Sequence, residues 1–216
     1  MSTKALIAAR SGSVRVKNKN LREFAGKNLL VLKIEQLLRI PELDGVVVNS
    51  NDDQMLRIAH DLGAETVKRN EFYASNTVSM SDVYKNMAEN FPGDVIVYTN
   101  CTNPLLKDET LSRAIHVYNE NAYAYDSLNS AHEIKEFLFK DGKPLNYDLL
   151  NQPRSQDLPD IYALNFAISI ISKKNMIRCK NVVGMDPFIF PIDAYEGIDI
   201  DNEIDFEFAE FAYSKR

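Results

Sequence analysis

The chain has 216 residues, and 45% of them are hydrophobic, which suits one globular domain over 1–216. Its formal net charge of −6 argues against a protein that binds nucleic acid through a basic face. Its two distant cysteines, Cys101 and Cys179, indicate reduced thiols and not a disulfide framework. No apolar run approaches the roughly 20 residues that span a bilayer, and the first residues lack a signal-peptide pattern, so we expect a cytoplasmic protein with no membrane or nucleic-acid partner.

Apolar runs and amphipathic stretches alternate along the first 120 residues. This rhythm predicts a Rossmann-like α/β fold, with a mostly parallel sheet and covering helices. Ligands of such sheets bind beyond the carboxyl ends of the strands, where the loops after residues 9, 49 and 98 fall. Strands are expected at 4–9, 45–49, 65–67 and 94–99, and helices at 28–39, 52–62, 79–90 and 108–120.

The rhythm breaks after residue 123. Residues 126–160 are too long for an ordinary connection, and they contain an Asp141-Gly142 pair that predicts a hairpin turn. We interpret this segment as a small inserted arm for dimerisation, which also acts as a substrate lid. Its apolar side chains suit a subunit contact better than ligand stacking. Strands resume at 162–172 and 187–192, and a helix at 202–213 ends the chain.

A basic loop follows the first strand. It lacks the spacing of a P-loop. Even so, Gly12 permits close approach of the backbone, and Arg10, Arg15 and Lys19 supply positive charge for a polyphosphate. The same composition also suits a solvated basic loop, so the loop alone leaves both interpretations open.

Two carboxylates lie near the end of the chain. If the backbone is extended there, Asp199 and Asp201 project from the same face, and paired carboxylates are typical ligands of Mg²⁺. The alternative is that Asp201, Asn202 and Glu203 form the N-terminus of the last helix. On their own, the two residues do not decide between these hypotheses.

Several short segments, taken in order, form a set that is more specific than any one of them. The segments are Ala8-Ala9-Arg10-Ser11-Gly12-Ser13, Lys19-Asn20-Leu21, Arg69, Ala74-Ser75-Asn76-Thr77, Thr102-Asn103-Pro104-Leu105, Gln152-Pro153-Arg154 and Ile198-Asp199-Ile200-Asp201. This set resembles the acylneuraminate (CMP-sialic acid synthetase) cytidylyltransferases over essentially the whole chain. The resemblance implies a nucleotidyltransferase-type fold, CTP as a substrate, Mg²⁺ or Mn²⁺ as cofactor, and a homodimer.

The resemblance also implies a role for each matching residue. Catalytic roles fall on Arg10 and Lys19 at the triphosphate and on the metal pair Asp199 and Asp201. Nucleotide binding further involves Ser11, Gly12 and Ser13 in the loop, and Asn20, Arg69 and Ser79 around the base and ribose. The acceptor would meet Asn100, Lys135, Arg154 and Asn165, with Lys135 and Arg154 acting partly across the dimer interface.

The chain departs from the family on the acceptor side. Where the sialic-acid enzymes usually read Arg-Pro-Asn-Gly, this chain reads Ala163-Leu164-Asn165-Phe166, and Asn100 replaces their glutamine. A sugar-facing arginine is therefore missing. We expect transfer of CMP to an acidic sugar, a sialic acid-like nonulosonate or a related 2-keto sugar acid. A phosphonate acceptor is the alternative, and a non-catalytic nucleotide-binding dimer is disfavoured by the retained charged set.

Overall fold

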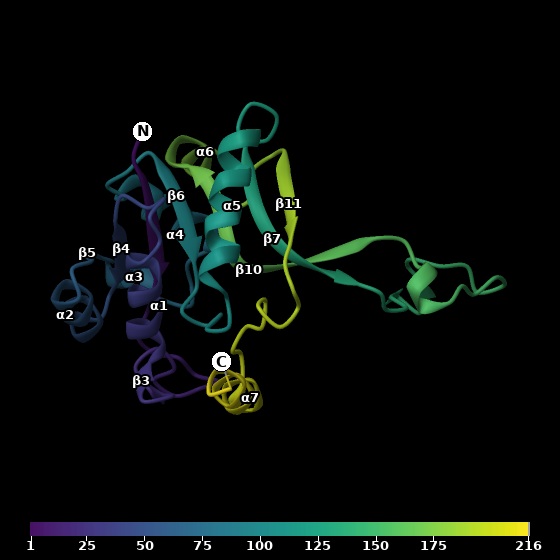
Figure 1. Ribbon diagram of the computed structural model, residues 1–216, viewed down its shortest axis with the longest axis horizontal. Coiled ribbons are helices and arrows are strands. Elements are labelled where there is room, and N and C mark those ends of the chain that lie inside the picture. Colours follow the sequence, from purple (N-terminus) through teal and green to yellow (C-terminus); the bar gives the residue numbers. More distant parts are fainter. Residues whose placement is uncertain (216) are drawn as a thin grey trace.

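A seven-stranded sheet forms the centre of the computed structural model, which describes residues 1–215 (Figure 1). Its spatial order is β11-β7-β10-β6-β1-β4-β5. Neighbouring strands are parallel except at β10, which runs antiparallel to both of its neighbours. The predicted mostly parallel α/β sheet is therefore confirmed. The strands are β1 (Thr3–Ala8), β4 (Val46–Ser50), β5 (Glu65–Lys68), β6 (Val95–Thr99), β7 (Ser127–Ile134), β10 (Ile161–Ser172) and β11 (Pro187–Pro191).

Helices cover both faces of the sheet, because its central strands are apolar on both sides. In β1, Ala5 and Ile7 face one hydrophobic core and Leu6 faces the other. The first core includes side chains of α1, α2, α5 and α7, and the second those of α4 and α6. The helices are α1 (Leu29–Leu38), α2 (Asp53–Asp61), α3 (Glu71–Ala74), α4 (Met80–Glu89), α5 (Asp108–Asn121), α6 (Lys173–Cys179) and α7 (Glu203–Tyr213).

Short polar side chains fix where the longer helices begin. Asn28, Asp52 and Ser79 each accept hydrogen bonds from the first turn of the helix that follows them. Asn202 does the same for α7, and Asp205 returns the bond in a capping box. These caps agree with the predicted helix starts. None of the helices within residues 1–215 is long and apolar enough to cross a membrane.

β7 is the main element that the sequence pattern did not predict. Its first five residues are buried although three of them are polar, so the segment reads as a loop. The polar groups are satisfied inside the sheet: Ser127 donates to Asn129, which donates to Ser169 Oγ at 3.0 Å. The short elements α3, α6, the η1 turn (Ser155–Asp157) and the β2 (Glu23–Phe24) and β3 (Lys27–Asn28) hairpin were also not predicted.

The arm projects away from the sheet as a narrow extension (Figure 1). The far end of β7 and the beginning of β10 form its stem, and the predicted hairpin is present as β8 (Phe139–Lys140) and β9 (Lys143–Pro144). The arm start predicted at residue 126 is wrong, because 127–131 are buried in the central sheet. The projecting part runs from about residue 135 to residue 160. Most of its side chains are exposed, Leu150 at 97%, whereas Leu158 is buried.

Candidate active site

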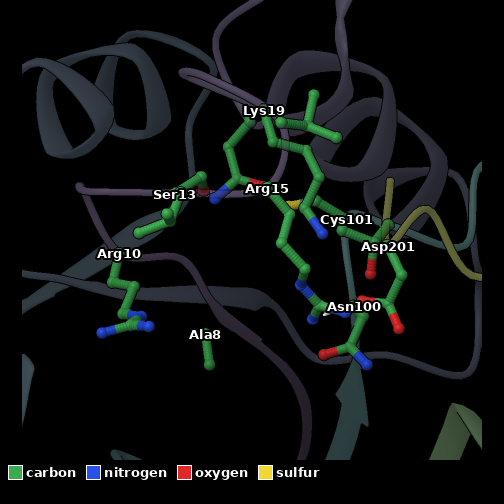
Figure 2. A pocket seen from close by; sticks show the side chains of 12 residues that line it. Ala8, Arg10, Ser13, Arg15, Lys19, Asn100, Cys101 and Asp201 are labelled. Atoms are coloured by element: carbon green, nitrogen blue, oxygen red, sulfur yellow. Dashed lines mark ion pairs between the residues drawn. The ribbon is translucent and has the colours of Figure 1, made fainter. Parts of the chain in front are cut away.

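The basic loop after β1 closes one side of a cavity of about 250 Å³, which we call the Lys19 cavity (Figure 2). The loop is not a freely solvated segment. Gly12 adopts φ +79°, a left-handed conformation that favours glycine, and Val16 is buried in the core. The cavity lies at the carboxyl ends of β1 and β6, as predicted. Its lining is Ala8, Arg10, Ser13, Val14, Arg15, Val16, Lys19, Asn20, Asn100, Cys101, Thr102 and Asp201.

Lys19 lies between the basic loop and the acidic pair. Its Nζ donates to the carbonyl oxygen of Ile200, the residue between the two aspartates. Burial lowers the pKa of Lys19, while the charges of Asp199 and Asp201 act to raise it. The structure therefore brings together three of the predicted catalytic residues, and the ammonium group offsets part of the negative charge of the pair.

The backbone around the acidic pair is held by several hydrogen bonds. Ile200 N donates to Thr102 O at 2.9 Å, and Asp201 N donates to Asp205 Oδ2 at 2.8 Å. Asn202 caps α7 and Glu203 is its first residue, as the alternative hypothesis expected, whereas the side chains of Asp199 and Asp201 take no part in the cap. Burial and the charge of Asp201 raise the pKa of Asp199, although a hydrogen bond with Thr102 acts in the opposite direction.

A second cavity of about 320 Å³, the Arg69 cavity, adjoins the first and shares Ala8 and Arg10 with it. Arg10 forms the boundary: its Nη1 donates to Ala74 O at 2.9 Å and to Asn76 Oδ1 at 2.8 Å. The lining is more apolar than that of the Lys19 cavity. It comprises Ala8, Arg10, Arg69, Tyr73, Ala74, Ser75, Asn76, Val78, Met80, Val83, Met87 and Tyr98.

Arg69 is a buried part of the lining of this cavity. Its side chain is buried and donates to Asn49 Oδ1 at 2.6 Å and to Asn49 O at 3.0 Å. Burial lowers its pKa, and nearby Arg10 acts in the same direction. Sequence reasoning did not single out Asn49, the partner that fixes the guanidinium. The signal for it was a polar residue at the end of an apolar strand.

Two of the predicted nucleotide-binding residues, Ser79 and Ser11, form hydrogen bonds with other parts of the chain. Ser79 caps α4, with its Oγ donating to Asp82 Oδ2 at 2.8 Å, and it lines neither cavity. Ser11 is held by Asn51, which accepts from its backbone N–H and donates to its Oγ. Ser13 and Asn20 do line the Lys19 cavity, so only some of the predicted residues of the basic loop reach it.

Comparison with known proteins identifies the family of the chain. The sequence model of the cytidylyltransferases matches residues 4–210. The chain belongs to the cytidylyltransferase family. The resemblance inferred from the ordered motifs is therefore confirmed, and with it a CTP-dependent nucleotidyltransferase.

Individual relatives and one solved structure are consistent with that assignment. The chain is 25% identical to pseudaminic acid cytidylyltransferase of Campylobacter jejuni subsp. jejuni serotype O:23/36 (strain 81-176), over 99% of this chain and 97% of that protein. It is 26% identical to N-acylneuraminate cytidylyltransferase of Oncorhynchus mykiss, over 95% of this chain and 49% of that protein. CMP:2-keto-3-deoxy-manno-octonic acid synthetase complexed with CTP has the same fold, with a TM-score of 0.70 at 12% identity over 100% of this chain and 99% of its own.

The structure brings the residues predicted for the acceptor together less completely. Asn100 lines the Lys19 cavity and donates to Phe166 O at 3.3 Å. Phe166 has φ +53° at a register shift in β10, and this irregularity turns Asn165 inward. Asn165 is buried beside Gly197, accepts from Ser130 Oγ at 2.6 Å, and lines neither cavity.

The two predicted acceptor cations of the arm bond to nearby residues of the arm and of its stem. Lys135 Nζ lies 2.6 Å from Asp160 Oδ1 and 2.9 Å from Glu133 Oε1, and these partners raise its pKa. Arg154 Nε lies 2.8 Å from Asp157 Oδ2. Neither residue lines a cavity of its own chain described above. The structure therefore does not bring them together with Arg10 and Lys19 within one chain.

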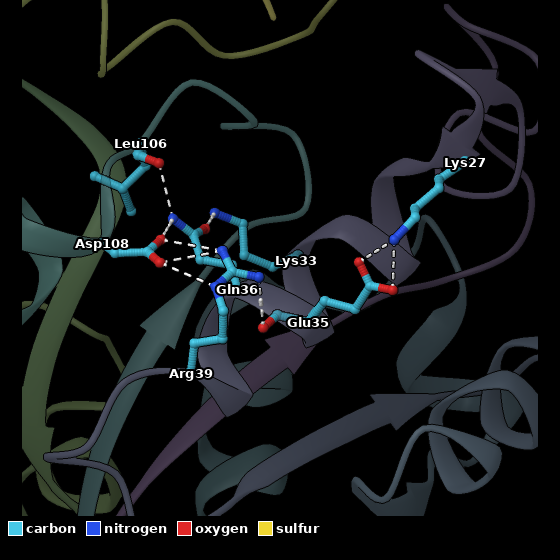
Figure 3. Close-up of polar contacts among 7 residues, drawn as sticks. All are labelled: Lys27, Lys33, Glu35, Gln36, Arg39, Leu106 and Asp108. Carbon is cyan, nitrogen blue, oxygen red and sulfur yellow. Dashed lines mark hydrogen bonds and ion pairs between the residues drawn. The ribbon is translucent and has the colours of Figure 1, made fainter. Parts of the chain in front are cut away.

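A polar cluster inside α1 supports the site and was missed by sequence reasoning (Figure 3). Lys33 is only 2% exposed, and its Nζ donates to Gln36 Oε1 at 2.7 Å and to Asn103 O at 3.1 Å. Gln36 in turn donates to Leu106 O at 2.8 Å. These bonds hold the loop whose Thr102 carbonyl anchors Ile200. A lysine within an apolar helix pattern gives little sign of such a role.

Proposed function

We propose that this cytidylyltransferase transfers CMP from CTP to an acidic sugar of the sialic acid-like nonulosonate or related 2-keto sugar acid class, releasing pyrophosphate. The observation that carries the proposal is the pair of adjoining cavities, one basic and lined by the carboxylate of Asp201, and one more apolar. That division matches the triphosphate and the nucleoside of CTP. The relatives named above support the acceptor class, because their names share an acidic sugar.

In this reaction an acceptor hydroxyl oxygen forms a bond to the α-phosphorus of CTP as the bond to pyrophosphate breaks. The hydroxyl proton passes to solvent, and the electron pair leaves with pyrophosphate. Arg10 and Lys19 would bind the phosphates and stabilise the charge that grows on the leaving group. Catalysis would then rest mainly on positioning and electrostatics, which supply large rate factors in closed sites.

The acidic pair fits a divalent cation, Mg²⁺ or Mn²⁺. The two carboxylates flank a carbonyl group that Lys19 binds. Burial, and after it the charge of Asp201, raises the pKa of Asp199, and a bound cation would offset both effects. The described residues contain no cluster of three or more His, Cys, Asp or Glu that could hold a metal ion alone. Asp199 and Asp201 would therefore share the ion with phosphate oxygens and water, as Mg²⁺ commonly requires. The ion would neutralise phosphate charge.

The nucleoside would occupy the Arg69 cavity. Tyr73, Met87 and Tyr98 offer apolar walls for a base, and Arg69 would keep the floor in shape through Asn49. Asn20 would contact the nucleotide from the Lys19 cavity. Cytosine is the base that the family assignment favours, and Ser79 would act mainly as the cap of α4.

The arm would complete the acceptor site of a second chain in a homodimer. Its exposed Leu149 and Leu150 supply apolar surface of the kind that marks an interface. Two-fold pairing would present Lys135 and Arg154 to the partner's site, where they could meet a sugar carboxylate. Both cysteines of the chain are free, which suits a reducing compartment such as the cytoplasm.

The decisive experiment is a screen for pyrophosphate release. The enzyme is incubated with Mg²⁺, each of the four nucleoside triphosphates, and acceptors that include sialic, pseudaminic and 2-keto-3-deoxy sugar acids, a neutral sugar and a phosphonate. We expect release only with CTP and an acidic sugar. Release with a phosphonate alone would favour the alternative acceptor, and no release with any pair would contradict the enzymatic proposal.

A further inference from the structure

Two cations approach the acidic pair in different ways. Lys19 binds the backbone between the aspartates, whereas Arg15 binds a carboxylate directly, with Nη2 2.8 Å from Asp201 Oδ1 (Figure 2). Arg15 has a side chain that is 69% exposed, while Lys19 is half-buried. An exposed ion pair is weak, on the order of 1 kcal/mol or less, so Arg15 is the cation that can leave.

The loop limits where Arg15 can go. The next residue, Val16, is buried in the core and anchors the backbone at this point. The Arg15 side chain lines the Lys19 cavity together with Arg10. A guanidinium released from Asp201 therefore stays within the cavity proposed for the triphosphate. Its planar fork of N–H donors matches phosphate oxygens better than a point charge does.

We propose that Arg15 is a place-holder for the divalent cation: it holds Asp201 in the nucleotide-free enzyme and transfers to the triphosphate when nucleotide and cation bind. The inference rests on the proposed function, specifically on Asp199 and Asp201 as the metal pair. A guanidinium and a divalent cation on one carboxylate repel each other, so the ion binds weakly until Arg15 leaves. By linkage, nucleotide and cation then raise each other's affinity.

The first test measures Mn²⁺ binding by electron paramagnetic resonance in the absence of nucleotide. Arg15→Gln should bind Mn²⁺ about threefold to tenfold more tightly than the wild type, because one competing charge is gone. Lys17→Gln is the matched control. It removes the same charge from the same loop, but Lys17 does not line the Lys19 cavity, so its Mn²⁺ affinity should stay within about twofold of wild type after salt screening.

The second test measures CTP binding by calorimetry in the presence of a chelator. Arg15→Gln should bind CTP about fivefold to twentyfold more weakly, since a charge-assisted hydrogen bond to phosphate is lost. Lys17→Gln should again resemble the wild type. Opposite changes in Mn²⁺ and CTP affinity are the signature of the place-holder, because general damage to the site would weaken both.

The variant Asp201→Asn distinguishes failure of the place-holder role of Arg15 from failure of the metal pair. If wild type and Arg15→Gln bind Mn²⁺ equally and both lose binding with Asp201→Asn, the place-holder is overturned and the metal pair stands. Unchanged CTP affinity in Arg15→Gln would also overturn it. If Mn²⁺ binding is undetectable in both proteins, or does not depend on Asp201, the metal pair of the proposed function is itself contradicted.

Discussion

The proposed nucleotide side of the site and the arm differ in how their polar side chains are held. Around the two cavities, polar side chains are fixed by other parts of the same chain: Arg69 by Asn49, Lys19 by Ile200, and the loop after β6 by Lys33. On the arm, Lys135 and Arg154 bond to nearby residues of the arm and its stem, and Leu149 and Leu150 are exposed. We infer that one chain suffices to bind the nucleotide, whereas turnover requires a second.

The largest effect is expected at the acidic pair. Asp199→Asn and Asp201→Asn should each lower kcat by at least about 100-fold, since each removes charge that holds the cation at the phosphates. Circular dichroism should show an intact fold, because the cap of α7 is Asn202. Near-normal turnover by both variants at ordinary Mg²⁺ concentration would contradict the metal assignment.

The arm offers the sharpest contrast with that result. Replacing Leu149 and Leu150 with serine should yield monomers in analytical ultracentrifugation and lower turnover by at least about tenfold, because apolar anchors dominate the energy of interfaces. The CTP dissociation constant should stay within about threefold of wild type. A fully active monomer, of wild type or variant, would mean that the arm is not needed.

A smaller effect is expected beneath the nucleotide side. Lys33→Met should lower the free energy of unfolding by about 1–3 kcal/mol in urea titrations, since it leaves the buried Asn103 carbonyl and Gln36 with fewer partners. Lys27→Met is the matched control, because Lys27 forms an exposed pair with Glu35 beside the same helix. Its cost should be below about 1 kcal/mol. Equal costs for the two would show that the cluster does not support the loop.

The smallest effect concerns the stability of the protein without ligands. Because the pKa of Asp199 is raised in the folded state, its ionisation opposes folding above that pKa. Asp199→Asn should therefore stabilise the protein at pH 7, by less than about 1 kcal/mol given solvent screening. The gain should shrink as pH falls toward the ordinary pKa of an aspartate. Thermal melts at several pH values would detect it, and a loss of stability at pH 7 would contradict it.

The sheet and the site edge could be predicted because apolar runs and caps are local signals. The strand ending at Ala8 and the helix capped by Asp52 follow from neighbouring residues alone. β7 could not be predicted this way, because its buried Asn129 depends on Ser169, forty residues away. Lys33 and Asn49 were missed for the same reason, since their partners are brought to them only by the folded chain.

Complementation between two inactive variants tests the shared site most directly. One variant carries Asp201→Asn, which disables the nucleotide side, and the other carries Lys135→Ala with Arg154→Ala, which disables the arm. In a mixed dimer, one of the two sites regains both intact halves. Random exchange of chains should therefore restore about a quarter of the wild-type activity. Activity no greater than the sum of the separate variants, in a mixture shown to contain mixed dimers, would contradict the claim that each site needs two chains.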